Sequence, residues 1–241
     1  MAQVSTRTAF TGSALTRLLA RLADIDVPES RRAFADRLSH WLGWTDAISL
    51  SGVLNGSPAV VPAGLRAVRA PSEEDECVRL RGVLAKAIAD DSALLAAEKD
   101  RPGNPGNPDK PADFSPYRRR YLARQQTMEM AIGPLRERLR ASLAARSPAM
   151  AQLAAVDAVM EQALSAQEYR LLATVPGLLE KHFRRLRQAH QEAVQDEPER
   201  GAPQVAWQDV FRKDMQAVLF AELDIRLEPV EGLLEALRKS S

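Results

Sequence analysis

The side chains best suited to acid–base, metal or thiol chemistry near neutral pH are few in this chain: His40, His182, His190 and Cys77. His182 and His190 are about two turns apart on a predicted helix, whereas helical ligands of one metal lie three or four residues apart. Cys77 falls on an apolar stripe, where a packed thiol is more typical than a reactive one. These residues favour neither a metal centre nor a nucleophile.

Two further motifs fail to complete a catalytic site. The tripeptide from His190 to Glu192 matches half of the zinc-deaminase signature, but the chain has a single cysteine and cannot supply the other ligands. The 12 glycines form neither a P-loop nor a dinucleotide-binding fingerprint. The sequence therefore predicts a protein that is not an enzyme and that holds no cofactor and no metal.

Arginine is the residue type that gathers most clearly. Residues 117–146 hold eight arginines and two glutamates, and a second basic cluster follows at 181–187. If the two helices pair, these clusters could contact phosphates or an acidic protein surface, and Tyr117 and Tyr121 could stack on bases. The alternative is a solvated arginine face, with tyrosines that anchor their helix to a neighbour. The candidate interaction patch consists of Arg118, Arg119, Arg120, Arg124, Arg184, Arg185 and Arg187.

The elements that position these residues must be helices. Apolar residues make up 45% of the 241 and aromatics only 5%, and strand-favouring runs are almost absent, so we expect an all-α protein. The net charge of +1 gives no global attraction to nucleic acid or to an anionic membrane. The single cysteine fits a reducing compartment, and no apolar run reaches the ~18 residues of a membrane span. We therefore expect a cytoplasmic protein without direct membrane insertion.

The first half of the predicted architecture is a small N-terminal module. Residues 1–54 are expected to form a helical hairpin whose second helix is interrupted at Gly43. Residues 55–71 carry Asn-Gly, Ser-Pro, Val-Pro and Ala-Pro pairs, which are typical of a linker. A third helix over 72–99, opened by a capping box at Ser72, is expected to pack on the N-terminal module.

The second half is predicted to be elongated. A linker over 100–116 with repeated Pro and Gly-Asn precedes a long, coiled-coil-like helical hairpin over 117–196, which reverses direction at Ser147-Pro148. Residues 204–241 are expected to form C-terminal helices divided by Pro229. The predicted heptad seam of the first arm consists of Tyr121, Gln125, Met128, Ile132, Leu135 and Leu139.

An eleven-residue apolar period marks the second arm of this hairpin. It includes Leu153, Leu164, Leu171, Leu178 and Leu186, and it is typical of a helix that is nearly straight. A proline at 176 predicts a kink or a full break in this arm.

Three stretches carry a resemblance to a known family: FA-x-x-L-x-x-W over 34–41, WTDAISL over 44–50 and LLATVP-x-LLE-x-x-F over 171–183. With these, the chain resembles an uncharacterised proteobacterial family catalogued as domain of unknown function number 3348. The resemblance brings no activity, cofactor or catalytic residue. What it implies is association, because genes of the family neighbour those of proton-channel-like and peptidoglycan-binding OmpA-like envelope proteins.

The expected function is therefore a non-enzymatic cytoplasmic scaffold or adaptor. Its long helical faces would bind a second copy of the chain or a protein partner, such as an inner-membrane or OmpA-like envelope complex. The alternative is a helical protein that binds nucleic acid through the arginine patch, and this alternative predicts affinity that falls steeply with added salt.

Overall fold

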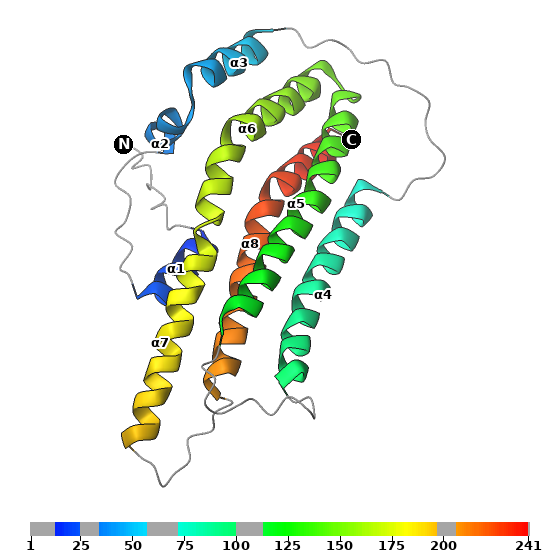
Figure 1. Cartoon of the computed structure of the whole chain (residues 1–241). Helices are drawn as coiled ribbons and strands as arrows, with labels where there is room; N and C mark the ends of the chain where they lie inside the picture. Colours follow the sequence, from blue (N-terminus) through cyan, green and yellow to red (C-terminus); the bar gives the residue numbers. More distant parts are fainter. Residues whose placement is uncertain (1–12, 25–33, 57–71, 100–112, 197–205, 241) are drawn as a thin grey trace, which may run out of the picture.

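The computed structural model describes residues 13–24, 34–56, 72–99, 113–196 and 206–240 (Figure 1). Within these ranges the chain forms helices and no strand, so the predicted all-α class is confirmed. The helices are α1 (Ala14–Ala23), α2 (Phe34–Trp41), α3 (Trp44–Asn55), α4 (Glu73–Lys99), α5 (Ser115–Ala144), α6 (Pro148–Leu172), α7 (Val175–Asp196) and α8 (Ala206–Lys239).

Three long helices, α4, α5 and α8, form the frame of the molecule. The helices α5 and α8 run in the same direction, and α4 runs opposite to both (Figure 1). Ion pairs show this order, because Glu74 near the start of α4 pairs with Arg238 near the end of α8, whereas Arg81 pairs with Asp224 and Glu231. We expected the helix over 72–99 to pack on the N-terminal module, and the structure corrects this: α4 packs against α5 and α8. The physical reason is the apolar face of α4, which the larger seam of α5 and α8 buries.

The predicted heptad seam is the centre of the core. All six of its positions are buried in α5, together with Leu143. They pack against four neighbouring helices, α4, α6, α7 and α8, rather than against one coiled-coil partner. The helix also continues through Pro134, because burial of the residues on both sides offsets the ~3 kcal/mol that an interior proline costs.

The chain reverses direction between α5 and α6 at the predicted place. Ser147 is the N-cap of α6 and its hydroxyl accepts from the backbone N–H of Met150 at 3.2 Å, with Pro148 in the first turn. Residues 173–174 then separate α6 from α7, and the Thr174 hydroxyl donates to a carbonyl of the last turn of α6. The long bent helical hairpin is therefore confirmed, with its break where Pro176 predicts one.

The buried residues of α6 and α7 are not the same as those of the predicted eleven-residue apolar stripe. Leu153 and Leu171 belong to the stripe, yet they are 41% and 51% exposed. The reason is that α6 is contacted by α5 on one side and by α3 on another, so burial follows these two neighbours and not one straight face. The buried positions of α6 and α7 include Ala151, Ala154, Leu172, Val175, Leu179 and Phe183.

The N-terminal helices lie against different parts of the hairpin. Helix α1 packs on α7 and α8, whereas α2 and α3 pack on α6. Gly43 separates α2 from α3 as predicted, and its backbone N–H is capped by the Asp46 carboxylate at 2.9 Å. The connection 25–33 and most of the predicted linkers 55–71 and 100–116 lie outside the described residues.

Pro229 does not divide the last helix, contrary to the prediction from sequence. Helix α8 is continuous across it, over 34 residues. The apolar residues on both sides of the proline, Leu227 and Val230, are fully buried. Their packing outweighs the lost backbone hydrogen bond.

Candidate interaction surfaces

The α5 half of the arginine patch is divided between two faces. Arg120 and Arg124 point at α4, where both form ion pairs with the buried carboxylate of Asp91. Although burial alone would raise the pKa of Asp91, the guanidinium groups of Arg124 and Arg120 outweigh it and hold this pKa below its usual value. Arg118 and Arg119 lie exposed at the start of the helix, and no ion pair joins them to any other described residue. Two of these four arginines therefore serve the fold.

The α7 half of the patch also makes contacts inside the chain. Arg184 pairs with Glu180 one turn earlier, and Arg187 also has a partner. Arg185 donates to the backbone carbonyl of Leu22 and to Nδ1 of His182. The bond to Leu22 attaches α1 to α7. The two arginine clusters are therefore not gathered into one free basic surface.

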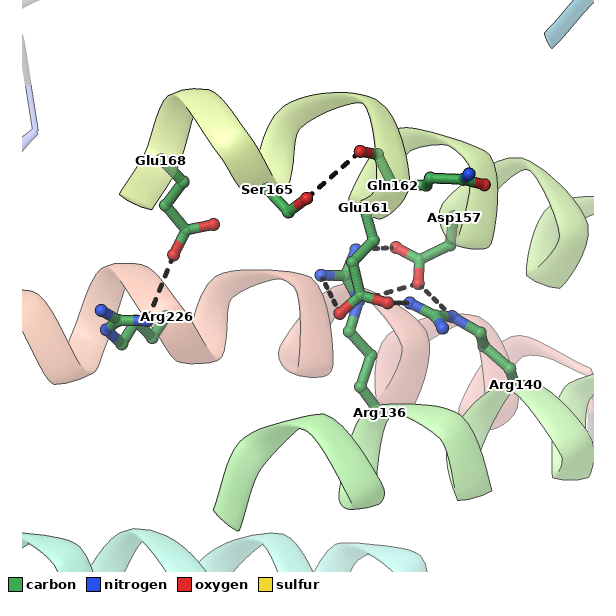
Figure 2. Close-up of polar contacts among 8 residues, drawn as sticks. All are labelled: Arg136, Arg140, Asp157, Glu161, Gln162, Ser165, Glu168 and Arg226. Carbon is green, nitrogen blue, oxygen red and sulfur yellow. Dashed lines mark hydrogen bonds and ion pairs between the residues drawn. The ribbon is translucent and has the colours of Figure 1, made fainter. Parts of the chain in front are cut away.

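A second group of arginines, outside the predicted patch, is neutralised between α5 and α6. Figure 2 shows Arg136 and Arg140 of α5 reaching Asp157 and Glu161 of α6. Burial would raise the pKa of the Asp157 carboxyl, but the two guanidinium groups outweigh it and lower this pKa. The four charges balance, so this cluster closes the hairpin and leaves no net charge for a partner.

One fully buried carboxylate, Glu222 of α8, has its hydrogen bonds supplied by neighbours. It accepts from the Tyr121 hydroxyl at 2.5 Å, from Gln125 Nε2 at 3.0 Å and from Arg226 Nε at 2.9 Å. Burial, followed by the charge of Glu222, raises the pKa of Tyr121, so the phenol stays a donor. Tyr117 packs edge-on against Phe211, and both tyrosines therefore anchor α5 rather than face solvent.

The histidines and the cysteine considered for catalysis or metal binding pack against other side chains wherever the structure describes them. His182 is buried, donates through Nε2 to Asp214 at 2.8 Å and accepts from Arg185 on its other nitrogen. His190 lies against Trp207, while the side chain of His40 is outside the described set. Cys77 is buried, and burial raises the pKa of its thiol. Among the described residues no cluster of His, Cys, Asp and Glu could hold a metal ion.

Three exposed large apolar side chains lie on α3, and one of them, Trp44, is the most exposed large apolar side chain among the described residues. Trp44 is 81% exposed, Ile48 56% and Leu54 55%. Trp44 and Ile48 lie one turn apart on the same side of the helix, and Leu54, in its last turn, lies ~120° around the axis from Ile48. The opposite side of α3 faces α6, where Gln152 donates to the carbonyls of Val53 and Leu54. The only charged residue of α3 is Asp46, which caps the helix. We call Trp44, Ile48 and Leu54 the α3 face.

An apolar groove runs between α6, α7 and α8. It consists of two hollows of ≈ 530 Å³ and ≈ 440 Å³ that share Glu168, Leu171 and Ile225. The larger hollow is closed by Trp41 of α2 and by α5, and the smaller one by α1. Three leucines of the predicted eleven-residue stripe, Leu164, Leu171 and Leu178, line this groove. Part of the predicted stripe therefore lines a hollow on the surface.

The three signature stretches lie on helices that form the α3 face or line the apolar groove. FA-x-x-L-x-x-W is α2, WTDAISL is the first part of α3, and LLATVP-x-LLE-x-x-F spans the break between α6 and α7. A family model described as "Protein of unknown function (DUF3348)" matches residues 1–239. The chain belongs to the DUF3348 family. No curated protein and no solved structure matches the DUF3348 chain.

The signatures of the DUF3348 chain divide into inward and outward parts. At the α6–α7 break, Leu172, Val175 and Phe183 are buried in the common core. In WTDAISL, by contrast, Trp44 and Ile48 point away from the core. Within the described part of the DUF3348 chain, no helix is both long and apolar enough to cross a membrane.

Proposed function

We propose that this DUF3348 protein is a non-enzymatic helical scaffold or adaptor whose α3 face docks on a protein partner or on a second copy of the chain. The observation that carries the proposal is the exposure of Trp44, Ile48 and Leu54 together on one helix. Large apolar side chains that gather on a surface mark interaction sites, and tryptophan is enriched among the residues that dominate binding energy.

The remaining surface of α3 supports the same proposal. A helix that lies on the outside of a bundle normally carries charges on its solvent face. Here only Asp46 is charged, and its carboxylate is occupied by the helix cap. The uncharged α3 face can therefore be covered by another apolar surface without burying an unpaired charge.

The arginine contacts give the nucleic-acid alternative less support than the sequence did. A phosphate-binding patch needs several arginines free to face one backbone. Arg120, Arg124 and Arg184 are held in ion pairs within the chain, and Arg185 is bonded to α1. We therefore propose a protein partner, for which the envelope complexes implied by the family resemblance are the first candidates, and we keep the expected cytoplasmic location as part of the proposal.

The test compares the tagged full-length chain with a Trp44→Ser, Ile48→Ser double variant in native cells. The matched control is Val83→Ser, which removes an exposed apolar side chain from α4. We expect one protein to be recovered at a fixed ratio with wild type and control, to resist nuclease, and to fall at least tenfold with the double variant. Sedimentation of the purified chain measures whether that protein is a second copy. Equal recovery with all three chains, or loss on nuclease treatment, would overturn the proposal.

A further inference from the structure

We propose that the apolar groove between α6, α7 and α8 binds a cationic amphipathic helix of a partner protein. This site is separate from the α3 face, and it can be occupied whether or not α3 docks on anything. The inference rests on three properties of the described residues: the apolar floor, the length of the groove and the charge of its rim.

The floor of the groove is formed by aliphatic side chains that the fold leaves partly uncovered. Leu171 lies where the two hollows meet and is 51% exposed, and Ile225 of α8 lines both hollows. Leu164 and Leu178 extend the floor on either side of the α6–α7 break. A half-exposed leucine in a concave surface gains most from an apolar side chain that fills the hollow.

The length and the helical surroundings indicate the shape of the occupant. The floor runs from Leu164 in α6 to Leu178 in α7 across the break at 173–174, so its length is at most ~20 Å at 1.5 Å per residue, the length of about 14 residues of a helix. The walls are helices, whose backbone groups are already bonded within each helix. An extended strand would find no backbone partners here, whereas a helix brings its own hydrogen bonds and inserts only side chains.

The rim selects a positively charged partner. The larger hollow is lined by four glutamates, Glu129, Glu161, Glu168 and Glu228, and by two arginines. Both arginines are neutralised within the chain, Arg136 by Asp157 and Glu161, and Arg226 by Glu222 and Glu168 (Figure 2).

Two of the rim carboxylates are left over. Glu129 and Glu228 are exposed and form no ion pair with any described residue. This acidic rim attracts lysines that flank an apolar stripe, and it repels nucleic acid and anionic lipid.

The probe is a fluorescent 14-residue peptide of leucine and lysine with its leucines at helical spacing. It is compared with the same peptide carrying glutamate in place of lysine, and with a leucine–lysine peptide whose leucines are scrambled. Binding to the full chain is measured by anisotropy. We expect the first peptide to bind at least tenfold more tightly than either control, with an affinity that weakens as salt is added.

Matched variants locate the binding. Leu171→Lys places a charge in the floor, which the apolar side of the peptide would have to cover. It should therefore weaken binding of the first peptide about tenfold, which corresponds to about 1.4 kcal/mol. Glu129→Lys with Glu228→Lys should weaken it at least threefold. Met130→Lys, on an exposed position of α5 outside the groove, and Trp44→Ser, on the α3 face, should leave it unchanged. Circular dichroism confirms that each variant is folded.

Each other result overturns the inference. If the scrambled peptide binds as tightly as the first peptide, or if Leu171→Lys has no effect on binding, the lysines of the peptide bind the chain outside the groove. Binding of the glutamate peptide removes the role of the rim. If no peptide binds but Leu171→Lys abolishes self-association or the binding of an apolar dye, the groove takes a second copy or a small apolar ligand instead. Because Trp44→Ser tests only the α3 face, failure here leaves the proposed function standing.

Discussion

Two buried carboxylates define what arginine and tyrosine do in this protein at the scale of single residues. Asp91 and Glu222 both lie inside the bundle with almost no exposed surface. A buried carboxylate is tolerated only when its oxygens are paired. Arg120 and Arg124 meet this need at Asp91, and Tyr121 contributes at Glu222.

Asp91→Asn should lower the free energy of unfolding by about 2 kcal/mol, because two guanidinium groups lose their charged partner. The measurement is urea unfolding at pH 7, with Asp90→Asn, at an exposed position, as the control. Since the two guanidinium groups hold the pKa of Asp91 in the folded protein below its usual value of 3.8, the stabilisation is complete above that value. It is lost as pH falls through the lowered pKa of the folded protein. If the difference in the free energy of unfolding between wild type and variant were the same at pH 7 and at pH 2, this account would be contradicted.

Tyr121→Phe removes the hydroxyl that donates to Glu222 and leaves a fully buried carboxylate with one donor fewer. We expect a loss of about 1–3 kcal/mol in the free energy of unfolding, measured by urea titration. Tyr169→Phe, on a largely exposed ring, serves as the control and should change it by less than about 0.5 kcal/mol. An equally small effect at both positions would mean that water replaces the phenol at Glu222.

Helix α4 shows, at the scale of elements, which interactions hold the frame together. Its ion pairs to α8, through Arg81 and Arg238, join side chains that are about half exposed. Among the side chains of α4 that the structure describes, the buried apolar ones include Leu84 and Ile88. Exposed ion pairs contribute about 0–1 kcal/mol, whereas a buried leucine contributes several. The apolar contacts therefore dominate.

Leu84→Ala should cost about 2–4 kcal/mol of unfolding free energy, because it leaves a cavity beneath α4. Arg81→Ala should cost less than about 1 kcal/mol, and 0.5 M salt should remove most of that difference. Chemical denaturation at low and high salt measures both. A larger effect at Arg81 than at Leu84 would show that charges and not packing keep α4 in place.

The same elements show why sequence reasoning succeeded in one place and not in another. The seam of α5 was predictable because one helix face is surrounded by neighbours, so its spacing alone determines burial. The stripe of α6 was not, because two neighbours, α3 and α5, compete for its sides.

The spacing along one helix shows where the arginines of the patch gather, but the carboxylate that pairs with Arg120 and Arg124 lies on another helix, α4. Asp91 is three residues from Ile88 on the apolar stripe of α4, and this position was the available sign that a buried cation partner exists. The docking role of the patch, and of the α3 face, stays a prediction.

At the scale of the whole molecule, the described residues form one core, to which helices α1 and α4 to α8 contribute buried side chains. No described side chain of α2 or α3 belongs to it. The proposed docking surface, the α3 face, is therefore carried by the part of the described structure that contributes least to the common core.

Hydrogen exchange followed by mass spectrometry should show this difference directly. Amides of residues 34–56 are expected to exchange by local opening, well before those at the centre of α5 and α8, which require global unfolding. Peptides from the exposed ends of α5 provide the control for simple fraying. Equal protection of α3 and the centre of α5 would mean that both open in one cooperative step.

The parallel pairing of α5 with α8 has a consequence for how the protein is made. The Tyr121 hydroxyl and its acceptor on Glu222 are 101 residues apart in the chain, with α6 and α7 synthesised between them. On the ribosome, the seam of α5 emerges well before the helix that covers it, so its leucines stay open to water and to other nascent chains. The sequence order thus leaves this apolar face without its α8 neighbour while α6 and α7 are made, an interval in which the nascent chain is open to aggregation.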